Sequence, residues 1–150
     1  EGDFVDGKMT GQGVYAWPDG GRYEGGIVDG RFNGKGFREW SNGDRYWGDF
    51  ADDERTGEGV YRWASGERYE GHFVDGHREG EGIYLWPGDS LYVGTFADDK
   101  ANGHGLRQWA DGRRYDGGWV DDLRDGDGWC IDPSGDNGPC RCVRNECSYK

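Results

Sequence analysis

The chain has 150 residues, 31 of them glycine, a formal net charge of -12 and a mean hydropathy of -1.06. The negative charge argues against a nucleic-acid-binding protein and against docking on an anionic membrane surface, and no apolar run reaches the roughly 18 residues of a membrane-spanning helix. Low hydrophobicity is typical of disorder, but 8 Trp, 9 Tyr and 6 Phe bury large areas when they pack. We therefore expect an ordered protein whose apolar surface is mainly aromatic.

A 23-residue repeat runs through the chain. Its Gly-x-Gly motif recurs six times without insertion, starting at residues 11, 34, 57, 80, 103 and 126. Tryptophan follows at Trp17, Trp40, Trp63, Trp86 and Trp109, and a Tyr-x-Gly motif recurs at Tyr23, Tyr46, Tyr69, Tyr92 and Tyr115. Because chance glycine pairs would drift in spacing, this fixed step indicates a repeat architecture.

Each repeat has the pattern of a β-hairpin. Residues 11–17 alternate glycine or aromatic residues with mixed residues, and residues 22–28 alternate in the same way, which is the period of two typical of strands. Turn sequences such as PDGG, SNGD and ADGR lie between such strands. We predict an all-β fold, an elongated single-layer antiparallel meander of 23-residue β-hairpin repeats with about a dozen short strands.

Pairing like faces gives a predicted register. It places Tyr23 opposite Trp40 and Gly25 opposite Arg38, so tryptophans and tyrosines would alternate in one exposed row. Glycine beside each ring would leave room for the ring to lie flat on the backbone. We predict that this row is a binding groove formed by Trp17, Tyr23, Trp40, Tyr46, Trp63, Tyr69, Trp86, Tyr92, Trp109 and Tyr115.

The repeat resembles the MORN family (membrane occupation and recognition nexus) over residues 1 to about 129. The resemblance rests on a Tyr-Glu-Gly motif followed by Gly-x-Gly-x-Tyr-x-Trp, as in Tyr69, Glu70, Gly71, Gly80, Gly82, Tyr84 and Trp86. It implies a single-layer sheet of stacked hairpins and a scaffold in cytoskeletal, ciliary or junctional assemblies, or a neighbour of an unrelated catalytic domain. Lipid binding was proposed for the family, and the charge of -12 argues against it here.

Four positions depart from this pattern. Trp47 and Val93 stand where other repeats carry glutamate, and Arg38 and Arg107 stand where others carry tyrosine. Two interpretations are open: drift within a repeat, or a place where a partner sits, since exposed aromatic and arginine residues dominate many interfaces.

Two domains are predicted, a repeat array over residues 1–129 with an incomplete first repeat and a Cys-rich C-terminal cap over residues 130–150. The first strand, at residues 1–4, lacks its tyrosine and would leave an edge open to pairing. For the cap three states are open: two disulfides in a secreted or surface-exposed protein, a Cys₄ zinc site, or free thiols in a cytoplasmic or cytoskeletal one. All three concern Cys130, Cys140, Cys142 and Cys147.

No catalytic motif stands out in the sequence. His72, His77 and His104 occupy repeat positions held elsewhere by Gly, Asp or Lys, which indicates surface residues rather than a catalytic base. The acidic clusters at residues 52–54, 98–99 and 121–122 lack the spacing of a calcium loop, and we interpret them as a solubilising rim. We expect no enzyme activity, no cofactor and no metal.

These features predict a non-enzymatic structural scaffold. It would bind a protein segment, or self-assemble as a dimer or head-to-tail filament, through its aromatic groove and sheet ends. The partner would be protein or a second copy, and not nucleic acid. Two alternatives are kept: a membrane-associated adaptor that binds acidic lipid, and the non-catalytic arm of a larger enzyme, because the chain starts within a repeat.

Overall fold

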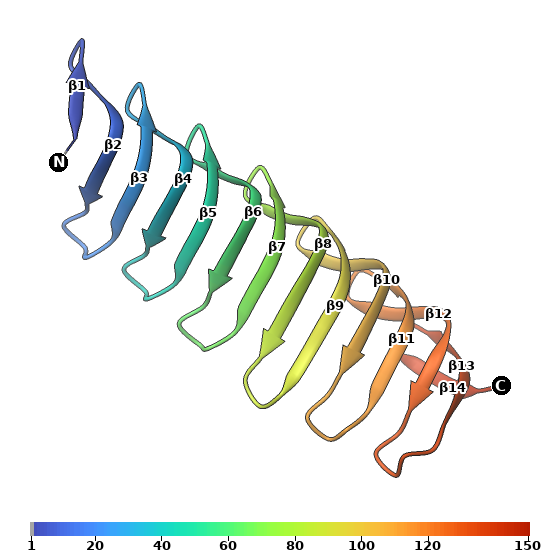
Figure 1. Ribbon diagram of the computed structural model, residues 1–150. Coiled ribbons are helices and arrows are strands. Elements are labelled where there is room, and N and C mark those ends of the chain that lie inside the picture. Colours follow the sequence, from blue (N-terminus) through green and yellow to red (C-terminus); the bar gives the residue numbers. More distant parts are fainter. Residues whose placement is uncertain (1) are drawn as a thin grey trace. The chain divides into compact units, whose positions relative to one another are not determined.

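The computed structural model describes residues 2–150, which form 14 β-strands arranged as two compact units. Within each unit the strands form a single open layer, and every strand pairs antiparallel with the next along the chain (Figure 1). No helix in this range is long and apolar enough to cross a membrane. The predicted all-β meander of hairpin repeats is confirmed, and Glu1 of the predicted first strand lies outside the described residues.

The first unit, which extends to His77, contains β1 (Asp3–Val5), β2 (Lys8–Ala16), β3 (Arg22–Val28), β4 (Arg31–Glu39), β5 (Arg45–Ala51), β6 (Glu54–Arg62) and β7 (Arg68–Val74). The second unit, Arg78–Lys150, contains β8 (His77–Trp86), β9 (Ser90–Ala97), β10 (Lys100–Gln108), β11 (Arg114–Val120), β12 (Leu123–Ile131), β13 (Asn137–Val143) and β14 (Glu146–Tyr149). The predicted division at residue 129 stays a prediction.

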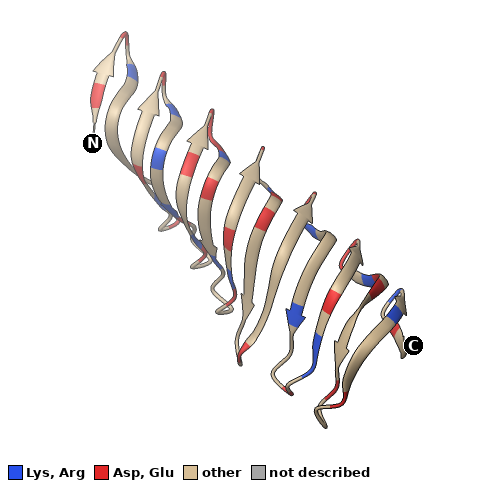
Figure 2. Cartoon of the chain, turned by 45° about the vertical axis from the view of Figure 1, so that its right-hand side comes forward, with Lys and Arg blue, Asp and Glu red and all other residues tan. Residues whose placement is uncertain are grey.

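The hairpins close at one end through two-residue turns with an Asp at the first position in six of the seven. Both turn residues have positive φ, as at Asp29 and Gly30 (51° and 82°) and at Asp52 and Asp53 (48° and 75°). This is the type I′ turn, which matches the twist of the flanking strands and tolerates Asp, Asn and Gly best. The acidic residues that Figure 2 colours red at these hairpin ends therefore include residues that the turn itself selects.

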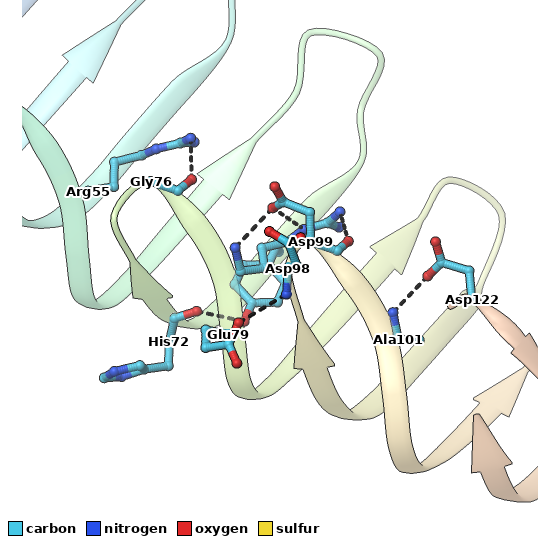
Figure 3. Close-up of polar contacts among 10 residues, drawn as sticks. Arg55, His72, Gly76, Glu79, Asp98, Asp99, Ala101 and Asp122 are labelled. Carbon is cyan, nitrogen blue, oxygen red and sulfur yellow. Dashed lines mark hydrogen bonds and ion pairs between the residues drawn. The ribbon is translucent and has the colours of Figure 1, made fainter. Parts of the chain in front are cut away.

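The second residue of a turn also connects its hairpin to the preceding one. The carboxylate of Asp53 accepts a hydrogen bond of 2.9 Å from the backbone N–H of Phe32, 21 residues earlier. Asp122 accepts one of 2.7 Å from Ala101 in the same way (Figure 3). The interpretation of the acidic clusters as only a solubilising rim is therefore incomplete, because one residue of each pair links adjacent hairpins.

At the opposite end the hairpins turn at the repeated tryptophan, and the last of them turns at Asp132. The N–H of Trp40 donates to the carbonyl of Asp44 at 2.9 Å, and the carbonyl of Trp40 accepts from Gly43 at 2.9 Å. Gly43 has φ of 90°, which explains the glycine at this place in the turn. The tryptophan backbone is thus used within its own turn, at the end of the strand.

This turn corrects the predicted register. Tyr23 pairs with Arg38, and Gly25 pairs with Gly36, so the prediction of Tyr23 opposite Trp40 is wrong by two residues. The reason is that Trp40 lies beyond the end of β4, with its backbone hydrogen bonds in the turn. Tryptophans and tyrosines therefore do not alternate in a single row.

The core of the sheet is a row of tyrosines lying over a row of glycines. Tyr23, Tyr46, Tyr69, Tyr92 and Tyr115 are at most 2% exposed. A Cβ added to Gly36 would lie 2.6 Å from the Tyr23 hydroxyl, and one added to Gly117 would lie 2.6 Å from that of Tyr115. Glycine does leave the space in which a ring lies on the backbone. Gly36 lies diagonally across from Tyr23 on the next strand, and Gly117 lies two residues along from Tyr115 on the same strand.

The hydroxyl of each core tyrosine donates a hydrogen bond to a backbone carbonyl, and for Tyr23 this carbonyl lies where the pairing of the two strands is irregular. The register of β3 and β4 shifts between Gly25 and Ile27. Tyr23 donates a hydrogen bond of 2.8 Å to the carbonyl of Gly26, which lies within that shift. The same bond to the residue three positions later recurs in the other repeats, at Tyr46, Tyr69, Tyr92 and Tyr115. A buried hydroxyl would otherwise lose its partner in water at a cost of about 1–3 kcal/mol.

Candidate functional site

The five repeated tryptophans lie at the rim of the tyrosine row, and all are half-buried. Trp63 packs against Tyr61 with ring centroids 4.5 Å apart, and Trp86 packs against Tyr84 at 4.3 Å. Each ring therefore has one side on the protein and another open to solvent. Each unit has such a surface, which we call its tryptophan face: Trp17, Trp40 and Trp63 in the first unit, and Trp86 and Trp109 in the second.

Two arginines are stacked among these rings. The Arg38 guanidinium carbon lies 5.0 Å from the ring centroid of Trp17 and 4.8 Å from that of Trp40. Arg107 lies 3.4 Å from Trp86 and 5.3 Å from Trp109. These are the positions where the sequence departs from tyrosine, so each unit holds a Trp-Arg-Trp stack stabilised by cation-π attraction.

A second set of arginines is anchored to the turns. Arg55 donates a hydrogen bond of 2.6 Å to the carbonyl of Gly76 (Figure 3), and Arg124 donates one of 2.7 Å to that of Asn145. Arg55 also lies over the ring of Tyr61, 5.0 Å from its centroid. These guanidiniums therefore clamp the turn of the next hairpin while they cover aromatic rings.

Burial lowers the pKa of arginines on this face and raises the pKa of tyrosines beneath them. It lowers the pKa of Arg38, of Arg107 and of Arg124, although an arginine with a reference pKa above 12 stays charged near neutral pH. It raises the pKa of Tyr23 and that of Tyr92 to about 12. The face therefore carries fixed positive charge on neutral rings.

The structure separates the ten predicted groove residues into two sets. The five tyrosines are buried under neighbouring rings and form the core, so the expectation that they are exposed is wrong. The five tryptophans are half-buried and remain accessible. Arg38 and Arg107, two of the departures from the repeat, lie between these tryptophans, and a partner at these positions stays a prediction. A binding role for the tryptophans stays a prediction.

The family model of the MORN repeat matches six consecutive segments, residues 1–22, 23–45, 46–68, 69–90, 92–113 and 115–137. The chain belongs to the MORN repeat family. We number the repeats 1 to 6 in this order. Trp17 lies in repeat 1, Arg38 and Trp40 in repeat 2, and Arg107 and Trp109 in repeat 5.

Solved structures resemble this MORN array, and the first one below shares its fold. One is "SAS-4 (dCPAP) TCP domain in complex with a Proline Rich Motif of Ana2 (dSTIL)" from Drosophila melanogaster, with a TM-score of 0.52 and 15% identity over 89% of this chain and 72% of that chain. Another is the TCP10 domain of Danio rerio CPAP with a STIL peptide, with a TM-score of 0.42 and 15% identity over 91% of this chain and 65% of that one. No curated protein matches the sequence.

The cysteines of the predicted cap form two disulfides, which confirms the disulfide prediction; the cellular location that it was tied to stays a prediction. Cys130 is joined to Cys140, and Cys142 is joined to Cys147. Cys142 and Cys147 are also direct partners in the β13–β14 ladder, so this disulfide closes the last hairpin of the chain. The first disulfide ties β12 to β13, and the cap is thereby crosslinked to the final MORN repeat.

The other face of each unit carries a short apolar row. Trp47, 41% exposed, pairs with Phe37 on one side and with Val60 on the other. In the second unit Val93 pairs with Ile83 and with Leu106. Trp47 and Val93, which stand where other repeats carry glutamate, therefore extend the apolar contacts between neighbouring strands. Such contacts stabilise the sheet itself, so no binding partner is needed to explain these two residues.

The histidines with described ion pairs lie at the surface beside acidic residues. His72 is 3.3 Å from Glu58, and His104 is 3.3 Å from Asp116. Each pair joins side chains from neighbouring strands, and all four side chains are well exposed. The interpretation of these two as surface residues agrees with their positions.

Proposed function

We propose that this protein is a non-enzymatic scaffold that binds an extended segment of another protein across the tryptophan face. The observation that carries the proposal is the recurrence of one half-buried tryptophan per hairpin, with Trp-Arg-Trp stacks in both units. Tryptophan and arginine with a packed side and an open side are the residues that contribute most to protein interfaces.

The spacing of the tryptophans favours a particular backbone conformation in that segment. Successive tryptophans within a unit are two strands apart, about 9.6 Å at the usual separation of neighbouring strands. A polyproline II helix repeats every three residues and rises about 9.3 Å in that distance. A segment of this kind, lying across the strands, places a side chain over a tryptophan at every third residue. Proline-rich segments bind aromatic surfaces in this way with little loss of entropy.

One structural neighbour supports the same class of ligand. The Drosophila TCP domain, which has a TM-score of 0.52 with this chain, was solved in complex with a proline-rich motif. Acidic lipid is a second candidate ligand: the net charge of -12 repels an anionic surface, whereas the arginines of the face would attract one.

Peptide display tests the proposal. A random library is selected on the wild-type protein and counter-selected on a variant with Trp40→Ser and Trp109→Ser. We expect enriched peptides with proline at a spacing of three residues and binding to the double variant weaker by about tenfold or more. Trp47→Ser is the matched control, because it removes a tryptophan from the other face.

Two outcomes contradict the proposal. One is the absence of any sequence enriched over the double variant, and the other is loss of peptide binding with Trp47→Ser but not with the Trp40 and Trp109 changes. Light scattering at several concentrations shows whether a second copy takes the place of the peptide. Sedimentation with vesicles of acidic phospholipid at low salt tests the lipid alternative.

A further inference from the structure

One position in repeats 2 to 6 lies over the tyrosine core, and its occupant changes along the chain. It is the second residue of strands β4, β6, β8, β10 and β12, and we call it the cover position. Its occupants are Phe32, Arg55, Arg78, Ala101 and Arg124. Four of these side chains reach across the neighbouring rings, whereas Ala101 of repeat 5 ends at Cβ.

The cover position is matched to the residue six positions later. Phe32 is followed by Arg38, whose guanidinium lies 5.7 Å from the phenyl ring. In repeats 3 and 4 the order is reversed, with Arg55 5.0 Å from the ring of Tyr61 and Arg78 5.3 Å from that of Tyr84. An aromatic ring and a guanidinium are therefore paired in three successive repeats.

Repeat 5 has the guanidinium of this pair without the ring. Arg107 stands at the position of Arg38, and Ala101 stands at the position of Phe32. Arg107 lies against Trp86 at 3.4 Å, closer than Arg38 lies to any of its three rings. The aromatic member of the pair is what this repeat lacks.

A pocket of about 270 Å³ opens where that ring would lie. Tyr92 and Ala101 are nearly buried among its lining residues, and the half-exposed Arg78, Trp86 and Arg107 line it as well. A cavity of about 150 Å³ is enough to bind benzene, so this volume accepts a substituted benzene ring. The carboxylate of Asp122, which bonds to the Ala101 N–H, also lines the pocket.

Repeat 2 shows how a ring lies in this position. Phe32 stacks on Tyr23 with ring centroids 3.7 Å apart and an interplanar angle of 12°. In repeat 5 the rings in contact with Tyr92 are Phe96 and Trp119, both edge-on at 5.2 Å. Tyr92 itself is 2% exposed, so its ring forms the covered floor of the pocket, and Ala101 marks the place that Phe32 fills in repeat 2.

We propose that the Ala101 pocket binds an aromatic side chain of the partner segment, which lies over Ala101 in the place that Phe32 takes in repeat 2 and pairs with Arg107. This rests on the proposed function and adds a requirement to it: one residue of the bound segment is Phe, Tyr or Trp. The guanidinium of Arg107 shifts from Trp86 onto the incoming ring. The cation-π attraction to Arg107 supplies the selectivity for an aromatic over an aliphatic residue.

The test uses the isotope-labelled full chain and p-cresol, the side-chain analogue of tyrosine. We expect saturable NMR shifts confined to the backbone amides of Ala101 and Asp122 and the indole N–H of Trp119. Ala101→Phe fills the pocket and should weaken binding at least about tenfold. The matched control is Ala110→Phe, which adds the same ring at an exposed turn and should bind p-cresol as the wild type does.

A second variant reproduces the pocket elsewhere. Phe32→Ala removes the ring over Tyr23 and leaves Arg38 in place, so p-cresol should now also shift the amide of Asp53. Unchanged binding in Ala101→Phe, shifts located elsewhere, or no saturable response in the wild type would each overturn the proposal. If Phe32→Ala folds and no response appears near Asp53, the comparison between repeats 2 and 5 is wrong.

The display selection separates this inference from the proposed function. Enriched peptides should contain an aromatic residue and lose affinity for Ala101→Phe. Peptides that need Trp40 and Trp109 but bind Ala101→Phe equally would overturn the pocket and leave the scaffold function standing. If p-cresol binds but no peptide is enriched, the pocket recognises a free aromatic compound, and the assignment to a protein partner fails.

Discussion

The hydroxyl of Tyr23 donates a hydrogen bond of 2.8 Å to the carbonyl of Gly26, three residues along the same strand. This carbonyl lies where the ladder between β3 and β4 shifts register. Tyr23→Phe keeps the ring and leaves that buried carbonyl without its donor. We expect a loss of about 1 kcal/mol in the free energy of unfolding, measured by chemical denaturation. Tyr15→Phe, at an exposed ring, should cost much less; equal losses would contradict the role of the hydrogen bond.

The row of glycines beneath the tyrosine rings leaves no room for a larger side chain, so adding one should destabilise the protein. An alanine at Gly36 would place Cβ 2.6 Å from the Tyr23 hydroxyl and 2.9 Å from its ring carbon Cζ. Gly36→Ala should therefore destabilise the protein by about 1–3 kcal/mol, because the ring must leave its place on the backbone. Gly138→Ala is the control, since its nearest contact would be an ordinary 3.7 Å. A melting temperature of Gly36→Ala equal to that of the wild type would refute the packing account.

The buried tyrosines predict unfolding in alkali. An unfolded tyrosine has a pKa of about 10, whereas burial, with the charge of Asp53 in addition, raises the pKa of Tyr23 to about 12. Burial likewise raises the pKa of Tyr92 to about 12, with smaller contributions from Glu81 and Asp122. The folded chain holds protons that the unfolded chain releases, so this stability is complete below about pH 10 and is lost as pH rises toward 12.

Denaturation midpoints across this range measure the effect. The midpoint should fall steeply above about pH 10, and the phenolate absorbance should rise together with unfolding. In Tyr92→Phe, one of the shifted groups is absent, so the fall should be less steep than in wild type. Phenolate formation in a chain that stays folded would show that these rings are open to water.

The hydrogen bonds that link neighbouring hairpins predict that two adjacent aspartates contribute unequally to the free energy of unfolding. Asp53→Ala removes the acceptor for the Phe32 N–H and should cost about 1 kcal/mol more than Asp52→Ala. Both changes remove one charge and place alanine at positive φ, so the difference isolates the hydrogen bond. Asp52 contacts Arg31 only in an exposed ion pair of 3.6 Å, which contributes little.

An amide should replace that carboxylate. Asn145 already accepts a hydrogen bond of 2.9 Å from the N–H of Arg124 in the equivalent place. We therefore expect Asp53→Asn to keep nearly wild-type stability in the same denaturation measurement. A cost equal to that of Asp53→Ala would mean that the negative charge, and not the acceptor, matters.

The two disulfides should differ in their effect. Cys130 and Cys140 are ten residues apart, and in the chain-entropy account their bond stabilises by about 2–3 kcal/mol. The bond between Cys142 and Cys147, five residues apart, should contribute about 0.6 kcal/mol less. Double serine variants of each pair, compared by hydrogen exchange, should show faster exchange in β13 and unchanged exchange in β3. Faster exchange in β3 would contradict a local role.

The hairpin fold could be predicted because glycine, tyrosine and tryptophan recur at fixed spacing and alternate with period two. The register could not, because a slip of two residues keeps every side chain on its face. The choice between Arg38 and Trp40 as the partner of Tyr23 depends on the turn, where the Trp40 backbone bonds to Asp44 and Gly43. Alternation of side chains contains no information on that choice.

The candidate site was predictable only in part. The tryptophans were found by their spacing, but the burial of Tyr23 depends on how the ring lies, which a pattern does not show. The cover position was missed because Phe32, Arg55 and Ala101 are chemically unlike one another. Its signal is a covariation within one chain: the residue six positions later changes type together with it, as in Phe32 with Arg38 and Arg55 with Tyr61.

The bonds between turns have a consequence for how the length of such a protein can change. Phe32 bonds to Asp53 and Ala101 bonds to Asp122, in each case 21 residues along the chain and to the adjoining hairpin. Interaction energies of this kind sum over neighbours. Removing one complete 23-residue period joins two hairpins that already have matching ends, whereas removing a fraction leaves mismatched ones. An array of this kind therefore gains or loses binding positions with the smallest loss of stability when whole 23-residue periods are added or removed.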